Sequence, residues 1–144
     1  TMQTFGILLV GGLYGPRLTM LSIFSYMIIG IIGVPVFQGH SGGINYFFGV
    51  TGGYLIGFIF ASVVISVLSN TGLKKGLSIW AMIIGNIFIY IPALIWLSIY
   101  DFGWPENGKL FSQAVYPFLI GDFLKLILAS LSINILWKLS KKNN

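Results

Sequence analysis

Two oppositely charged residues lie inside one long apolar stretch, and their types and spacing could do chemistry. Asp122 and Lys125 interrupt the largely apolar sequence of residues 116–131. A charge in the middle of a membrane span costs from about 2.5 kcal/mol upwards, so such residues usually mark a functional site. Their i, i+3 spacing places both on one face of a helix. They could bind a ligand, or they could be a self-neutralising pair buried for packing, and both interpretations stay open.

The composition is that of a polytopic membrane protein. Of the 144 residues, 56% are apolar and only 8% are charged, and the mean hydropathy is +0.92. Soluble domains carry about 25% charged residues. The chain has no cysteine and a single histidine, His40, so we expect no metal site and no cofactor. The net charge of +5 comes from lysines at segment ends, where membrane anchoring explains them, so we expect no nucleic-acid partner.

No sequence pattern indicates an enzyme. The chain lacks the phosphate-binding sequence GxxxxGK[ST], so it does not bind and hydrolyse ATP through a P-loop. A hydrolytic triad is unsupported because His40 and Asp122 are predicted on separate elements. We therefore expect a membrane protein without enzymatic activity.

Five apolar segments are predicted within a single membrane domain, residues 1–144. They cover residues 2–13, 18–36, 51–68, 77–100 and 111–137. The first is shorter than the roughly 20 residues that a span needs. The second contains Gly30, Gly33 and Pro35, so we expect its far end to be irregular.

A glycine-rich loop, residues 37–49, connects the second and third segments. Glycine permits left-handed turns and a close approach to a ligand. A long irregular loop that leads into a helix is also a common place for binding residues. We therefore predict a lid over a binding site, and an ordinary external loop is the alternative. The lid residues that we select are Gly39, Ser41, Gly42 and Gly43.

Positive charges predict the orientation in the membrane. If the segments alternate, the opposite side from the glycine-rich loop receives six basic residues: Arg17, Lys74, Lys75, Lys138, Lys141 and Lys142. The loop side receives only Lys109. Basic residues accumulate on the cytoplasmic side, so we expect a cytoplasmic C-terminus and an external loop. This alternation puts Thr1 outside, and with the short first segment and the absence of an initial Met it suggests that a preceding helix is missing.

Four stretches of the chain together carry a family resemblance. Residues 49–58 (GVTGGYLIGF) match one family signature, except that Val50 stands where proline is usual. Residues 117–125 (PFLIGDFLK) match a second signature, in the last helix. Residues 1–17 and 30–43 are similar to the first passage and the glycine-rich lid of the same family. In this order the stretches resemble the BioY family, the biotin-specific S components, or substrate-binding subunits, of energy-coupling factor transporters.

The resemblance implies an all-α integral membrane protein with the six-transmembrane-helix fold of an S component, of which this chain lacks helix 1. It implies biotin uptake across a bacterial or archaeal plasma membrane, energised by a separate transmembrane coupling protein and ATP-binding cassette ATPases. It also implies that Asp122 and Lys125 line the site, and that Asn45 can face the ureido group of biotin. Thr51 and Tyr54 begin the signature helix and are further candidate lining residues.

The chemistry of biotin fits this assignment. A buried lysine such as Lys125 suits the carboxylate, as a point charge with three donors. Asp122 would repel that carboxylate unless it hydrogen-bonds Lys125 or accepts from an N–H or hydroxyl group. Trp80, Trp96 and Trp104 are expected at the membrane interface rather than stacked on the ligand.

Two other classes of function stay open at this point. An ion- or proton-coupled secondary transporter would use Asp122 to relay a proton. A purely structural membrane subunit would have no ligand pocket.

Overall fold

This computed structural model describes residues 1–71 and 78–142, which form helices and the loops that connect them. The helices are α1 (Gln3–Leu13), α2 (Pro16–Ile31), α3 (Ile44–Phe47), α4 (Gly52–Asn70), α5 (Ser78–Ile99), α6 (Leu110–Ala114) and α7 (Tyr116–Lys142). Lys74 and Lys75, which we expect on the cytoplasmic side, lie outside the described residues.

Three of the apolar segments are long enough to cross a membrane: Gly52–Asn70, Ile79–Ile99 and Leu110–Ser140. The other two form α1 and α2, with 11 and 16 residues, which are shorter than a full span. The second predicted segment ends early, at Ile31, because Gly33 adopts a positive φ of 112° and Pro35 follows it. The expected irregular end is therefore present and begins sooner than predicted.

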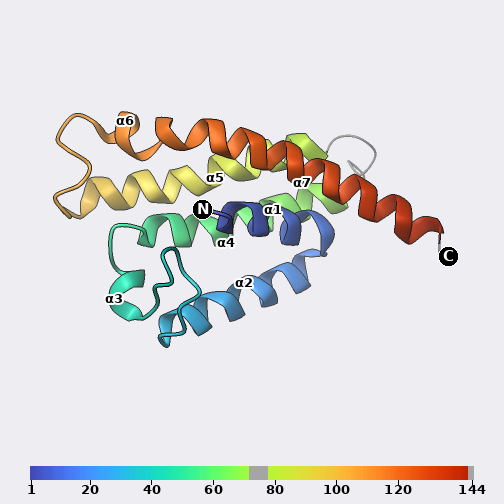
Figure 1. Ribbon diagram of the computed structural model, residues 1–144, viewed down its shortest axis with the longest axis horizontal. Helices are drawn as coiled ribbons and strands as arrows, with labels where there is room; N and C mark the ends of the chain where they lie inside the picture. Colours follow the sequence, from blue (N-terminus) through green and yellow to red (C-terminus); the bar gives the residue numbers. More distant parts are fainter. Residues whose placement is uncertain (72–77, 143–144) are drawn as a thin grey trace.

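The last apolar segment is interrupted, whereas the sequence suggested one continuous helix. Val115 separates α6 from α7, with φ −127° and ψ −61°. Pro117 follows at the second position of α7. Proline has no amide hydrogen to donate to the carbonyl of Gln113, so the hydrogen-bond ladder cannot continue from α6 into α7. The break leaves α6 as a short cap at one end of the bundle (Figure 1).

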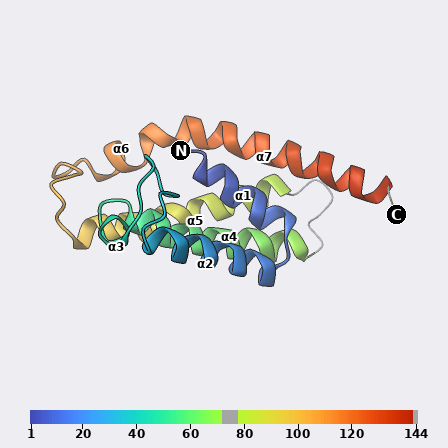
Figure 2. The same ribbon diagram turned by 60° about the horizontal axis from the view of Figure 1, so that its bottom comes forward.

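The long helices pack side by side. Figures 1 and 2 show α4 and α5 next to each other, with α2 on one side of α4 and α7 running across α1 and α5. The turn between α1 and α2 lies at the same end of the bundle as the C-terminus, and α3 and α6 lie at the other end (Figure 1). The N-terminus lies between the two ends of the bundle (Figure 1).

Glycines let α4 and α5 touch backbone to backbone. A Cβ atom at Gly57 would lie 2.4 Å from the carbonyl oxygen of Ile89, and one at Gly53 would lie 2.7 Å from the Cα atom of Ala93. Association of helices in lipid depends on such close packing, because lipid tails are as apolar as the side chains. The GxxxG spacing of Gly53 and Gly57 is therefore the contact surface of α4 toward α5.

Buried hydroxyl groups fasten the α1–α2 turn to α4. The carbonyl oxygen of Tyr14 accepts hydrogen bonds from the Ser66 hydroxyl at 3.0 Å, the Thr19 hydroxyl at 3.3 Å and the Asn70 amide at 3.4 Å. Interhelical bonds of this kind contribute about 0.6 kcal/mol on average in membrane proteins. They hold α1 beside α4, where its first turn reaches the cavity described below.

The packing predicts unequal effects of two glycine substitutions. Gly57→Ala should lower the thermal midpoint of unfolding, because the new methyl group meets backbone atoms that move only if α4 and α5 separate. Gly6→Ala is the matched control: Gly6 is also helical, but nothing lies within 4 Å of a Cβ there. The control should be neutral or stabilising, since alanine favours helix by roughly 1 kcal/mol over glycine. Thermal unfolding of detergent-purified protein checks this, and equal midpoints would contradict the packing.

Candidate ligand-binding cavity

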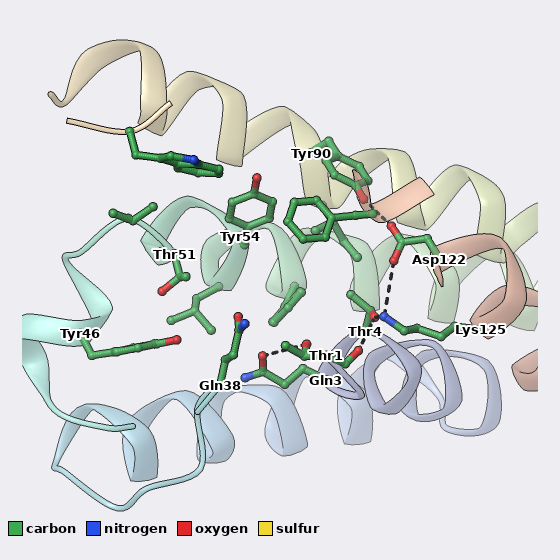
Figure 3. Close-up of a pocket in the computed structure, with 16 residues that line it drawn as sticks. Thr1, Gln3, Thr4, Gln38, Tyr46, Thr51, Tyr54, Tyr90, Asp122 and Lys125 are labelled. Atoms are coloured by element: carbon green, nitrogen blue, oxygen red, sulfur yellow. Dashed lines mark hydrogen bonds and ion pairs between the residues drawn. The ribbon is translucent and has the colours of Figure 1, made fainter. Parts of the chain in front are cut away.

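A cavity of about 300 Å³ opens between the helices, and side chains from α1, α3, α4, α5 and α7 line it (Figure 3). Five further lining residues lie outside the helices: Thr1 before α1, Gln38 before α3, Val50 and Thr51 between α3 and α4, and Trp104 before α6. The lining residues are Thr1, Gln3, Thr4, Gln38, Tyr46, Val50, Thr51, Tyr54, Leu55, Phe58, Ile89, Tyr90, Trp104, Phe118, Asp122 and Lys125. Ligand pockets are usually apolar spaces of this scale with a few placed polar groups.

Aromatic rings form much of the wall. The ring of Tyr54 meets those of Tyr90 and Phe118 edge-on, each with a centroid distance of 6.3 Å. The Tyr54 hydroxyl donates to the carbonyl oxygen of Ala114 at 2.6 Å, which ties α4 to the last residue of α6. An edge-on aromatic wall suits a compact apolar ring system.

The charged pair lies at one side of the cavity. The Lys125 ammonium is 3.7 Å from Oδ1 of Asp122, and it donates a hydrogen bond to the Thr4 hydroxyl at 3.0 Å (Figure 3). Lys125 is the more accessible partner, with 18% of its side chain exposed against 6% for Asp122. An ammonium has three donors, so Lys125 can offer further donors to a molecule in the cavity.

Two residues of α5 bind the other oxygen of Asp122. The Asn86 amide donates to Oδ2 at 3.2 Å, and the Tyr90 hydroxyl donates to the same atom. We did not select either residue from the sequence. Both are uncharged polar side chains inside the apolar segment 77–100, so the charge that identified Asp122 and Lys125 does not mark them, and only their polarity could have.

The predicted site residues do not all reach the cavity. Thr51, Tyr54, Asp122 and Lys125 line it. Asn45 is exposed on α3 and lies outside the lining, and the next residue, Tyr46, lines the cavity instead. Neighbouring side chains on the short α3 helix point in different directions, so Tyr46 faces the cavity and Asn45 does not. The predicted contact of Asn45 with a ureido group therefore has no support from this geometry.

The glycine-rich loop is folded rather than irregular. Phe37 and Ser41 form a backbone hydrogen bond of 2.9 Å, and the amide of Gly43 donates to the carbonyl of Gly30 at 2.7 Å. Gly39 and Gly43 have positive φ angles of 71° and 98°, as their position in tight turns requires. A Cβ at Gly42 would lie 2.4 Å from the carbonyl oxygen of Val34.

None of the four selected lid residues lines the cavity. The loop instead contributes Gln38, and α3 contributes Tyr46. The glycines and Ser41 therefore shape the loop, while these two neighbours reach the cavity.

Trp104 also lines the cavity, a position that our interpretation of the tryptophans did not favour. It belongs to the loop between α5 and α6.

The same loop carries an exposed ion pair. Lys109 donates to Glu106 at 2.6 Å, and this bond, with a second from Gln113, holds the pKa of the Glu106 carboxyl below its usual value.

The other two selected tryptophans lie outside the cavity lining. Trp96 donates its indole N–H to the carbonyl oxygen of Gly49 at 3.0 Å, and Trp80 is exposed.

Comparison with known proteins identifies the family. The sequence model of the BioY family matches residues 1–142. The chain belongs to the BioY family. This BioY family member is 37% identical over 126 residues to a probable biotin transporter BioY of Pyrococcus horikoshii, an alignment that covers 87% of this chain and 72% of that protein. It is 32% identical over 131 residues to the biotin transporter BioY of Thermotoga maritima, covering 91% of this chain and 76% of that protein.

A solved structure shows the same fold. The crystal structure of the S-component for biotin from an ECF-type ABC transporter matches this BioY family member with a TM-score of 0.79 and 30% sequence identity. The match covers 95% of this chain and 74% of that one. The prediction of an all-α membrane protein with the S-component fold is confirmed. Family membership also confirms the expectation of a multi-pass transporter subunit rather than an enzyme.

Proposed function

We propose that this chain binds biotin in the cavity and mediates its uptake across the plasma membrane. The observation that carries the proposal is the position of Lys125, whose ammonium lies at one side of an aromatic-lined cavity of about 300 Å³. The names of the relatives and of the similar S-component supply the ligand, because each is described as a protein for biotin. The cavity counts against a purely structural subunit.

The lining offers a partner for each part of biotin. The carboxylate of the valeryl tail would meet Lys125. The apolar thioether ring would pack against Tyr54 and Phe118. Thr51 lies across the cavity from Lys125, and Gln38 also points into it (Figure 3), so we assign these two side chains to the ureido group in place of Asn45. Gln38 can both donate and accept, as a ureido group requires.

Asp122 supports Lys125 in this proposal. Both of its oxygens already contact protein groups: Oδ2 accepts from Asn86 and Tyr90, and Oδ1 faces Lys125. A carboxylate so engaged is better suited to holding the lysine than to relaying protons. This geometry favours ligand binding over the ion- or proton-coupled alternative.

Energy for uptake would come from other proteins. The sequence has no P-loop pattern, and the similar S-component is described as part of an ECF-type ABC transporter. We therefore propose a transmembrane coupling protein and ATP-binding cassette ATPases as partners. Reconstituted uptake that needs ATP and these added partners would support this. Uptake that a pH gradient drives, and that Asp122→Asn abolishes, would support a secondary transporter instead.

The orientation proposal places the C-terminus in the cytoplasm and the loop of residues 37–49 outside. The α1–α2 turn, which is followed by Arg17 in the first turn of α2, shares its end of the bundle with the C-terminus, as the charge distribution requires (Figure 1). The chain has no cysteine, so single cysteines report cleanly. An impermeant thiol reagent added outside intact cells should label Ser41→Cys and leave Lys138→Cys unlabelled. The reverse pattern would overturn the orientation.

We propose that the loop with Gly39, Ser41, Gly42 and Gly43 acts as a lid that biotin orders. Gln38 and Tyr46, which flank these residues, line the cavity, so a bound ligand would contact both ends of the loop. A lid must change its backbone shape at low cost, which glycine allows. Biotin should slow proteolytic cleavage within residues 37–49, while cleavage of the C-terminal tail stays the same. Equal cleavage of the loop with and without biotin would count against a lid.

The contact between Lys125 and the carboxylate predicts a ligand-dependent mutant effect. Lys125→Ala should weaken biotin binding by about 2–5 kcal/mol, as when one partner of a desolvated charge pair is truncated. The same change should barely affect biotin amide, which carries no charge. Titrations of the purified protein with both ligands and a panel of other vitamins measure this. Equal losses for acid and amide would show that Lys125 is structural.

A further inference from the structure

The carboxylate of Asp122 is bound on the side away from Lys125. Two donors from α5, the amide of Asn86 and the hydroxyl of Tyr90, share its Oδ2 atom. The nearest approach of its other oxygen to the Lys125 ammonium is 3.7 Å, which exceeds a hydrogen bond. Lys125 donates instead to the Thr4 hydroxyl at 3.0 Å. The pair is therefore held open from both sides.

An unrestrained pair would close. An ammonium and a carboxylate in apolar surroundings form a charge-assisted hydrogen bond at roughly 2.7–2.9 Å. Closure would satisfy Lys125 internally and bring the negative charge of Asp122 closer to the ammonium that would meet the ligand. Both effects would disfavour an anionic ligand.

The two donors come from adjacent turns of one helix. Asn86 and Tyr90 are four residues apart on α5, so their side chains lie on the same face. Asn86 is buried, with 8% of the residue exposed, and does not line the cavity. Tyr90 lines the cavity, and its hydroxyl bonds Asp122. The Asn86 amide and the Tyr90 hydroxyl therefore act on a ligand through Asp122 and Lys125, while the Tyr90 ring forms part of the cavity wall.

We propose that Asn86 and Tyr90 are positioning residues that give the cavity its preference for a carboxylate ligand. They hold Asp122 away from Lys125, so that the ammonium stays available to the ligand. This inference rests on the proposed contact between Lys125 and the carboxylate of biotin.

The test is the ratio of the dissociation constants for biotin amide and biotin, measured by titration of the purified full chain. Tyr90→Phe keeps the ring and removes only the hydroxyl. It should reduce the preference for the acid by about tenfold, the size expected from losing one hydrogen bond to a charged group. Asn86→Leu, which keeps the approximate shape, should reduce the same ratio in the same direction. Either variant alone tests the proposal if the other does not fold.

Repeating the Tyr90→Phe substitution in an Asp122→Asn variant shows whether Tyr90 acts through the Asp122 carboxylate or only through packing. In Asp122→Asn the carboxylate charge is gone, so adding Tyr90→Phe should leave the acid-to-amide preference of that background unchanged. Tyr54→Phe is the matched control, because Tyr54 also lines the cavity but its hydroxyl bonds Ala114. It should shift the affinities for acid and amide by one common factor.

The outcomes distinguish this inference from the proposed function. If the unmodified chain prefers biotin over its amide but Tyr90→Phe and Asn86→Leu leave that ratio intact, the positioning role is wrong and the Lys125 contact stands. Persistence of the Tyr90→Phe effect in the Asp122→Asn background would also overturn it. If the unmodified chain binds acid and amide equally, the Lys125 contact itself is wrong.

Discussion

The structure depends on a carboxylate and an ammonium that lie 3.7 Å apart in apolar surroundings. Transfer of each charge out of water costs several kcal/mol, and the attraction between them compensates only when hydrogen bonds satisfy the remaining groups. Here the supporting donors and acceptor come from two helices: Asn86 and Tyr90 on α5, and Thr4 on α1. The pair on α7 therefore needs α1 and α5 beside it, and this requirement defines one side of the cavity.

Close packing of α4 and α5 builds another side of the cavity. Gly53 and Gly57 bring the two backbones into contact, and the rings of Tyr54 and Tyr90 then meet edge-on at the cavity. In lipid, where no hydrophobic force drives helices together, such small-residue contacts and interhelical hydrogen bonds carry the association. Binding geometry and bundle stability therefore depend on the same helix pair.

Sequence reasoning is most informative where a residue type has one dominant physical explanation. A charge in an apolar run pointed to Asp122 and Lys125, and both line the cavity. Clustered glycines predicted tight turns, and Gly39 and Gly43 have positive φ angles. The contact of Asn45 with a ureido group stays a prediction, and Tyr46 rather than Asn45 lines the cavity, because no periodic pattern reveals the direction in which a short helix between two turns presents its side chains. Asn86 and Tyr90 were overlooked although their polarity in an apolar segment was visible.

By itself, the sequence determined the membrane class, the family and the charged pair, because composition, signature motifs and the cost of an intramembrane charge depend on residue identity alone. Only the tertiary structure decided which groups bind Asp122, that Tyr46 rather than Asn45 reaches the cavity, and that Trp104 joins the wall. These contacts join residues far apart in the chain. They follow from the rotation and depth of each helix against its neighbours, which close packing sets and local sequence does not.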